Sequence, residues 1–322
     1  MRPAAETRAP LDDDEELLSR VAWYYHHDGL TQHEIGQRLG LSRVKVSRLL
    51  DRGKRSGIIG ITIHSRHRGC LELETRLREA YALREAIVIP PLEDASGDPV
   101  VHLNERLAQA AASYLMRFLS ERSLLAIGWG DTVTRTLSRL GYLLGHTGAS
   151  VMTLTGGVSA YVQMIGGLGA IPAKPQRVFM IPSPLVVASR ATAEALLGEP
   201  AVRDVLGMAP TANYALVGVG AMNENASFVR GGYVSTAEMV RYRREGAVGD
   251  LLGRFLDREG RVLDLEIHDR IIGIDLPALG RMPCVIGAAG GPQKADAIRA
   301  VLAGGYLDVV ITDQPTATAI LA

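Results

Sequence analysis

The chain has 322 residues, which exceeds a DNA-binding module alone and suggests about two domains. Its 35 basic and 35 acidic residues balance to zero net charge, so a positive surface requires a local concentration of charge. Two distant cysteines exclude a disulfide framework, and the absence of a long apolar run or a signal-like N-terminus excludes a membrane partner, so we expect a cytoplasmic protein with reduced thiols.

The N-terminal part predicts a helix-turn-helix DNA-binding domain over residues 12–65, preceded by a disordered tail over residues 1–11. Residues 12–28 carry apolar side chains at helical spacing, which predicts a first helix with an inward face formed by Leu17, Leu18, Val21 and Tyr25. This helix would complete a three-helix unit.

The second predicted helix begins at Thr31, because Thr31 and Glu34 have the spacing of a capping box. Ile35 on its inward face is followed by Gly36, which lets another helix approach closely. Gly40 supplies the permissive backbone that a sharp turn requires. The pattern therefore predicts the turn of a helix-turn-helix motif.

A third helix capped by Ser42 would turn Val46, Leu49 and Leu50 inward and leave a polar, basic outer face. In this motif the second helix of the pair lies in the major groove, where arginine suits guanine. The segment from residue 38 to residue 68 contains nine basic residues and one acidic residue, a net charge of +8. An ordinary helical hairpin with a solvated basic face is the alternative. The predicted DNA-binding residues are Thr31, Gln32, Ser42, Arg43, Val44, Lys45, Ser47, Arg48 and Arg52.

Two weaker patterns follow the predicted recognition helix. Residues 58–63 alternate apolar with small or polar residues, which indicates a strand that could form a wing. Residues 66–84 are expected to be a linker helix, with apolar residues at helical spacing from Leu71 to Leu83, and this helix could pair between subunits.

Residues 85–322 alternate short apolar strands with helical stretches, which predicts a Rossmann-like α/β domain. Several strands run directly into glycine-bearing turns, and ligands bind beyond the carboxyl ends of the strands in open α/β sheets. We therefore expect one crevice to collect these turns. The predicted strands are 86–89, 124–127, 151–154, 178–181, 214–219, 285–289 and 307–311.

Two of these turns suggest an anion site. Gly130, Asp131 and Thr132 would offer free amides and a hydroxyl at a helix N-terminus, although a tight turn needs glycine for geometry alone. Lys294 is expected near a helix N-terminus, where a cation is unfavourable to the helix dipole unless a negatively charged partner lies close to it. The alternative is a solvated surface lysine. Asp313 is expected to be a helix N-cap, and Asp250 is expected to begin an apolar helix.

The chain resembles the SorC family of bacterial sugar-sensing transcriptional regulators. The resemblance covers nearly the whole length and is carried by SRVKVSRLL, GWGDT, TGG, GAVGDLLGRFLDREG and AAGGPQKADAIRAVLAGGYLDVVITD. It implies a domain with the fold of ribose-phosphate isomerases and glucosamine-phosphate deaminases that binds a phosphorylated sugar and adjusts operator affinity. It also implies a homo-oligomer, usually a tetramer. The chain departs from the family at Gln314, where an acidic residue commonly follows the aspartate.

When the family's ligand-binding positions are matched to residues of this chain, the resemblance implies a phosphate-binding turn with Lys294 as its cation, and further residues that line the sugar. The expected effector-binding residues are Gly128, Gly130, Asp131, Thr132, Gly156, Gly157, Gln163, Arg230, Asp250, Gly290, Gly291 and Lys294.

Two other functions remain to be weighed. An isomerase-like or deaminase-like enzyme fused to a DNA-binding domain would need a positioned base, and the carboxylates in the glycine-rich turns have no histidine beside them. A DNA-binding scaffold whose second domain only oligomerises would bind no small ligand, and so many open helix N-termini argue against it. We therefore expect a regulator without catalytic residues, metal or cofactor, whose partners are operator DNA and a sugar phosphate.

Overall fold

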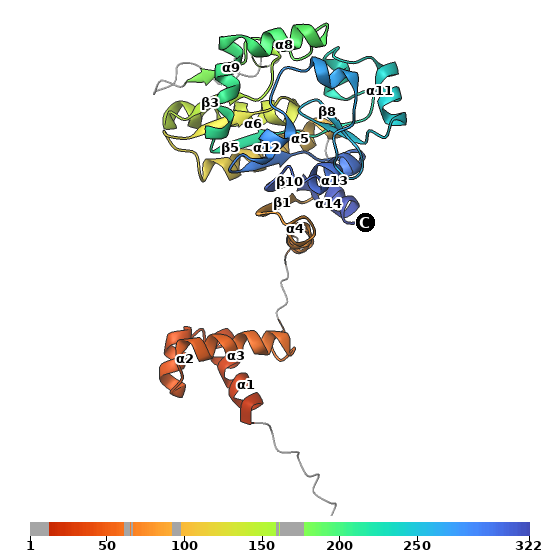
Figure 1. The fold of residues 1–322 in the computed structure, drawn as a ribbon. Coiled ribbons are helices and arrows are strands. Elements are labelled where there is room, and N and C mark those ends of the chain that lie inside the picture. The colour runs from red at the N-terminus through yellow and green to blue at the C-terminus, as the bar shows by residue number, and fades with distance from the viewer. Residues whose placement is uncertain (1–12, 61–64, 66, 92–97, 159–160, 162–176) are drawn as a thin grey trace, which may run out of the picture. The chain divides into compact units, whose positions relative to one another are not determined.

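The computed structural model describes residues 13–60, 65, 67–91, 98–158, 161 and 177–322 (Figure 1). The chain divides into two compact units, residues 1–65 and residues 66–322. The expected tail, most of the expected wing strand and Gln163 lie outside the described residues, and residues 58–60 form no strand. None of the helices in the described ranges is long and apolar enough to cross a membrane.

The first unit is a three-helix bundle of α1 (Asp13–His26), α2 (Gln32–Leu39) and α3 (Arg43–Arg55). Thr31 and Glu34 form the capping box that starts α2, and Gly40 ends it in the left-handed conformation with φ 68°. Ser42 caps α3 by accepting a hydrogen bond from the Lys45 backbone N–H at 3.2 Å. The predicted turn and both predicted caps are therefore confirmed.

The core of this unit consists of buried residues from all three helices: Leu18, Val21, Ile35, Val46, Leu49 and Leu50. The prediction that Tyr25 points inward is wrong, because its side chain is exposed. Tyr24 packs against the core instead. Tyr24 lies three residues after Val21 on α1, and three-residue spacing serves the same face as four-residue spacing, so the sequence pattern admitted either tyrosine.

Gly36 permits the close turn between α2 and α3. A Cβ atom at this position would lie 2.5 Å from the backbone oxygen of Leu41. Both atoms are fixed by the backbone, so no side-chain rotation can relieve the overlap. We expect Gly36→Ala to destabilise the first unit by about 1–3 kcal/mol through this overlap. Hydrogen exchange of the full chain should show faster exchange in α2 and α3 and unchanged exchange in the second unit. Gln37→Ala on the exposed face is the control, and equal protection in the two variants would contradict the argument.

The second unit contains a seven-stranded parallel sheet with the strand order β1-β10-β9-β5-β2-β3-β4. Every strand predicted from the sequence is present; the strand at 124–127 has the predicted ends, and the other six differ from the prediction at one or both ends. The strands are β1 (Glu85–Ile89), β2 (Leu124–Ile127), β3 (Ser150–Thr153), β4 (Val178–Phe179), β5 (Tyr214–Val217), β9 (Val285–Ala288) and β10 (Val309–Asp313).

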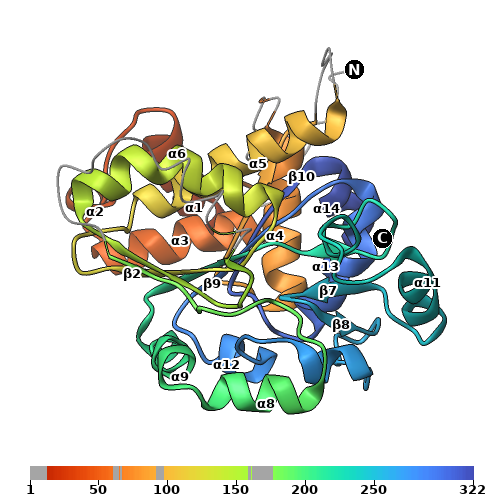
Figure 2. The ribbon, with the colours of Figure 1, turned by 90° about the horizontal axis from the view of Figure 1, so that it is seen from above.

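Helices cover both faces of this sheet, as its apolar strands require. Side chains of α5 (Pro99–Met116) and α6 (Asp131–Thr147) pack on one face with residues such as Leu125 and Ile127. Side chains of α4 (Arg68–Tyr81), α12 (Leu276–Gly280), α13 (Ala295–Ala303) and α14 (Gln314–Ile320) pack on the other face with Ala126 and Met152. Figure 2 shows α6 and α12 on opposite sides of the strands.

Shorter elements complete the unit around the sheet. They are α8 (Arg190–Gly198), α9 (Pro200–Gly207), α10 (Ser227–Arg230) and α11 (Thr236–Arg244), with 3₁₀ turns η1 (Ala209–Thr211), η2 (Glu266–Arg270) and η3 (Pro292–Lys294). After β2 the chain adds β3 and β4 on one side of that strand. It then returns to the other side of β2 and adds β5, β9 and β10 there, so the order of strands changes direction between β2 and β5. Such a switch point leaves a crevice at the carboxyl ends of β2 and β5.

A small antiparallel sheet was not predicted from the sequence. It has the order β6-β7-β8, with β6 (Gly220–Ala221), β7 (Gly249–Leu251) and β8 (Arg254–Leu256). The expected helix beginning at Asp250 is therefore wrong. Leu252 and Gly253 both have positive φ, 53° and 82°, and form the two-residue turn of a β-hairpin. The apolar run around this turn has helical spacing, which concealed the hairpin.

Candidate functional sites

The first candidate site is the outer face of α3. Of the predicted DNA-binding residues, Ser42, Arg43, Val44, Lys45 and Arg48 are exposed there, whereas Ser47 is half-buried. Val44 is 60% exposed although it is apolar, which suits contact with a partner such as a thymine methyl group. Among the residues that the structure describes, Arg43, Lys45 and Arg48 form no ion pair, so their charges are available to a partner.

Arg52, also on α3, differs from its neighbours. Its Nη1 atom lies 2.8 Å from Oδ2 of Asp14 on α1, with both side chains about half exposed. A surface pair of this kind contributes little stability.

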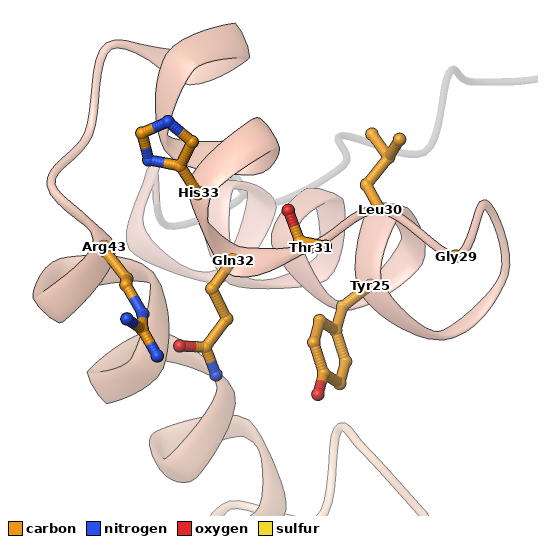
Figure 3. Close-up of a pocket in the computed structure, with 7 residues that line it drawn as sticks. All are labelled: Tyr25, Gly29, Leu30, Thr31, Gln32, His33 and Arg43. Carbon is orange, nitrogen blue, oxygen red and sulfur yellow. The ribbon is translucent and has the colours of Figure 1, made fainter.

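A hollow beside the α3 N-terminus gathers three predicted residues, Thr31, Gln32 and Arg43 (Figure 3). Tyr25 and His33 also line it, and neither was among the DNA-binding residues predicted from the sequence. In Figure 3 the side chains of Tyr25, Gln32 and Arg43 extend to the same side of the helices. Tyr25, which was predicted to point into the core, points outward and adds an aromatic hydroxyl to the candidate surface.

The second candidate site is a cleft of about 460 Å³ in the second unit. Its walls come from the ends of β2 and β5, from α5, α6 and α10, from β6 and β7, and from η3. This is the crevice expected at the switch point of the sheet. Its volume suits a small metabolite.

The structure brings together in this cleft half of the expected effector residues. They are Gly130, Asp131, Thr132, Arg230, Asp250 and Lys294. The expected crevice is thus present, and the turns after β2 and β5 contribute directly to its lining.

Five expected glycines do not line the cleft and serve close packing instead. Gly128 lies behind Leu252, whose methyl group would be 2.9 Å from a Cβ at residue 128. Gly156 and Gly157 donate their N–H groups to Ile272 and Ser183, so these amides are already engaged. The prediction that all the glycine turns open into one crevice is therefore wrong for Gly156 and Gly157. Gly290 and Gly291 contact Asp313 rather than the cleft.

The α6 N-terminus forms one wall of the cleft. Gly130 precedes it with φ 131°, a conformation that favours glycine, and the amides of the first turn have no intrahelical acceptor. The Asp131 carboxylate is already bound, since Oδ2 accepts hydrogen bonds from Asn104 and Arg135, each at 2.8 Å. The Thr132 hydroxyl donates to Asn104 at 3.3 Å. Asn104, which was not predicted, therefore orders this end of the cleft.

Asp250 and Lys294 face the same cleft from β7 and η3. Asp250 is 6% exposed, and its Oδ2 accepts a hydrogen bond from the Gly253 N–H at 3.1 Å. Burial raises the pKa of Asp250 to about 6, partly offset by the Gly253 N–H and by the charge of Lys294. Gly220 on β6 leaves room for this carboxylate, because a Cβ there would lie 1.8 Å from Oδ1.

Lys294 is one of three cationic residues in the described lining of the cleft, with Arg135 and Arg230. Burial lowers its pKa, while the charges of Asp250 and Asp131 act in the opposite direction and Arg230 adds to the lowering. Its ammonium group has no ion-pair partner within 4.0 Å in the part of the chain that the structure describes. A desolvated cation without a close partner favours an anionic ligand.

The raised pKa of Asp250 predicts a pH-dependent stability. The folded protein binds the Asp250 proton more tightly than the unfolded chain does, and this proton binding stabilises the fold. The stabilisation is fully present below pH 3.8 and is lost as the pH rises to about 6. We expect Asp250→Asn to raise the free energy of unfolding by up to about 3 kcal/mol at pH 8. Thermal unfolding should show a larger gain in Tm at pH 8 than at pH 5. Asp204→Asn on the exposed face of α9 is the control, and a pH-independent change would contradict the buried-carboxyl argument.

The loop after β6 contributes cleft residues that sequence reasoning missed. Asn223, Asn225 and Ser227 line the cleft with amide and hydroxyl groups, and Trp129 and Phe228 provide apolar walls. The Trp129 and Phe228 rings pack together, with centroids 5.5 Å apart. The available signal was the position of the NENAS segment just beyond a strand that ends in a glycine turn. Amides and hydroxyls are the groups that sugar hydroxyls bind.

Comparison with protein families gives two matches. A family of sugar-binding domains matches residues 65–322, and region 4 of sigma-70 factors matches residues 19–56. Two relatives are named transcriptional regulator LsrR. The relative from Enterobacter sp. strain 638 is 45% identical and covers 96% of this chain and 94% of its own length. The relative from Escherichia coli K12 is also 45% identical and covers 96% and 95%.

Solved structures with the same fold include the full-length sorbitol operon regulator SorC from Klebsiella pneumoniae. It is 23% identical, covers 97% of this chain and all of its own, and has a TM-score of 0.69. The sugar-binding domain of a transcriptional repressor from Vibrio fischeri is 26% identical, covers 78% of this chain and 98% of its own, and has a TM-score of 0.66. With a three-helix unit, a parallel α/β unit and these relatives, the chain belongs to the SorC family of sugar-binding transcriptional regulators.

Proposed function

We propose that this protein is a transcriptional regulator of a carbohydrate-utilisation operon, and that a phosphorylated sugar in the cleft controls its affinity for operator DNA. Relatives 45% identical over almost the whole chain are named transcriptional regulators. The sugar-binding family match spans the unit that contains the cleft.

The observation that carries the ligand class is the set of anion-binding groups in one cleft. Lys294 and Arg230 are two cations there, and the first turn of α6 adds backbone N–H groups at a helix N-terminus. A phosphate group satisfies these donors and the desolvated ammonium together. The polar side chains of Asn223, Asn225 and Ser227 are then available to the sugar hydroxyls.

Regulation accounts for the site better than catalysis does. No histidine lines the described part of the cleft, and the Asp131 carboxylate is held by Asn104 and Arg135. Asp250 is the carboxylate with a pKa suited to proton transfer, so turnover has to be tested directly. Incubation with ribose 5-phosphate or glucosamine 6-phosphate should leave each sugar phosphate unchanged by NMR, whereas product formation would favour the enzyme.

DNA binding is assigned to the outer face of α3, presented in pairs by a homo-oligomer, for which we propose a tetramer. Two recognition helices in successive major grooves would read a pseudopalindromic operator. The fourfold state is expected from the family resemblance and is measured by light scattering at several protein concentrations. A monomer at all concentrations would contradict it.

Thermal unfolding with a ligand panel tests the effector assignment. The panel contains ribose 5-phosphate, glucosamine 6-phosphate, glucose 6-phosphate, their unphosphorylated sugars and inorganic phosphate. A ligand at about 100 times its Kd adds roughly 2.7 kcal/mol to the free energy of unfolding. We expect a shift in Tm with a sugar phosphate and none with the matching free sugar. Equal shifts with both forms, or none at all, would contradict a phosphate-directed site.

A further inference from the structure

The turn between β9 and η3 connects the cleft to the interior of the second unit. Lys294, the last residue of η3, lines the cleft. Gly291, the last residue of the turn before η3, donates its N–H to Oδ1 of Asp313 at 2.8 Å. At Gly290 a Cβ would lie 2.3 Å from the same oxygen. Asp313 is 3% exposed, so the turn and this carboxylate pack without space for either to move alone.

Asp313 also fixes the start of α14. Its Oδ2 accepts a hydrogen bond from the Thr316 N–H at 3.3 Å, and its Oδ1 accepts one from the Thr316 hydroxyl at 2.5 Å. The N-cap predicted from the sequence is therefore present. One carboxylate binds both the cleft turn and the first turn of α14, so a displacement of the turn is transmitted to that helix.

Gln314, the residue after Asp313, contacts the first turn of α4. Its Oε1 accepts a hydrogen bond from the Cys70 thiol at 3.5 Å. Its Nε2 would lie 3.0 Å from a Cβ at Gly69, so the side chain lies directly against the α4 backbone. Buried residues of the two helices, Leu77 of α4 and Ile320 of α14, belong to one apolar cluster.

The position of α4 in the chain gives this contact its significance. The helix begins at Arg68, and the second unit begins at Arg66, directly after the unit that contains α3. Among the described helices of the second unit, α4 therefore follows the DNA-binding unit most closely in the sequence. Gln314 contacts this start of α4, while Asp313 contacts the cleft turn, and the two residues are adjacent.

We propose that Asp313 and Gln314 are the positioning residues that couple effector binding to the start of α4. This inference rests on the proposed function and adds the route by which the cleft acts on DNA affinity. A phosphate drawn to Lys294 moves the Gly290–Gly291 turn, Asp313 carries that movement to α14, and Gln314 carries it to Gly69 and Cys70. Neither positioning residue lines the cleft.

Gln314→Ala separates coupling from both folding and binding. Gln314 is only half-buried, its side chain accepts one weak thiol hydrogen bond, and it is absent from the cleft lining. We therefore expect nearly unchanged Tm and sugar-phosphate affinity within about twofold, because only a weak contact is removed. Gln314→Glu keeps an acceptor oxygen for Cys70 and should retain the response. Thr75→Ala, on the exposed face of α4, is the matched control.

Hydrogen exchange of the full chain tests the proposal, using the panel sugar phosphates and inorganic phosphate as probes. A probe that slows exchange in residues 285–303 should also change exchange in residues 67–75 of the unaltered protein and of Thr75→Ala. In Gln314→Ala the first effect should persist and the second should fall to less than about one third, as expected for loss of the coupling contact. An equal response at residues 67–75 in Gln314→Ala would overturn the coupling role, as would no response there in the unaltered protein. No protection of residues 285–303 by any probe would instead contradict the proposed function on which the inference rests.

Discussion

Replacing Lys294 with methionine is expected to weaken sugar-phosphate binding at least about 25-fold while operator binding without effector stays within about twofold. The ammonium is desolvated in the cleft, and its described surroundings contain no ion-pair partner within 4.0 Å. Removing one partner of a buried charge pair costs about 2–5 kcal/mol, and each 1.4 kcal/mol is a factor of ten in affinity. Methionine keeps most of the side-chain volume, so the packing around η3 should be retained. Titration calorimetry with the panel sugar phosphate gives the affinity.

Arg281→Met is the control for the Lys294 prediction, because it removes a cation from an exposed position on the same unit that does not line the cleft. Its sugar-phosphate affinity should equal that of the unaltered protein. Equal affinities for Lys294→Met and Arg281→Met would show that the Lys294 ammonium does not bind the phosphate.

The second large effect is expected at the recognition helix. Arg43→Ala should weaken operator binding by about 1–3 kcal/mol and relax discrimination at one base pair, as expected if Arg43 reads a guanine. Arg43 is exposed at the start of α3, beside Gln32 in the hollow shown in Figure 3. Fluorescence anisotropy with an operator duplex selected from a random pool, and with single base-pair variants of it, measures both effects.

Lys45→Ala distinguishes base reading from a phosphate contact. Lys45 is exposed on the same helix, and an ammonium binds phosphate as a point charge. Its replacement should weaken binding to all duplexes similarly and reduce the salt dependence by about one unit of slope. A uniform loss in Arg43→Ala as well would place Arg43 on the DNA backbone and contradict its assignment as a base reader.

The DNA-binding unit was predictable because its signals are local. A capping box needs two side chains three residues apart, and Thr31 and Glu34 satisfy it. Gly36 and Gly40 are required by the turn itself, and the apolar residues of α3 share one face. The prediction that Tyr25 points inward was wrong because helical spacing does not distinguish two adjacent tyrosines when either can approach the core.

The parallel strands were predictable because each is a short apolar run between turn residues. The β7–β8 hairpin was not predictable, because its turn puts Leu252 at positive φ. Leucine rarely adopts this conformation, so its presence in the sequence does not indicate a turn. Its apolar residues have helical spacing as well. Residue propensity and the spacing of the apolar residues therefore both favoured a helix, whereas tertiary packing stabilises a hairpin at this position.

The cleft was predictable only in part. Gly130 and Lys294 follow strands directly, so their places at the carboxyl edge of the sheet follow from the strand pattern. Gly156 has the same sequence context but is needed because a Cβ would lie 2.2 Å from the backbone oxygen of Pro184. Asn104 reaches the cleft from α5 through tertiary arrangement, which carries no periodic signal in the sequence.

Coupling between a bound sugar phosphate and operator affinity can be measured in both directions on the same protein. Operator affinity is measured by anisotropy with and without the panel sugar phosphate, and sugar-phosphate affinity by calorimetry with and without operator. The two ratios must be equal because coupling between binding sites is reciprocal, and a typical coupling of about 1–3 kcal/mol corresponds to roughly 5-fold to 150-fold. We predict equal ratios in this range, reduced toward one in Gln314→Ala. Ratios of one in both directions for a sugar phosphate that binds the cleft would contradict the account.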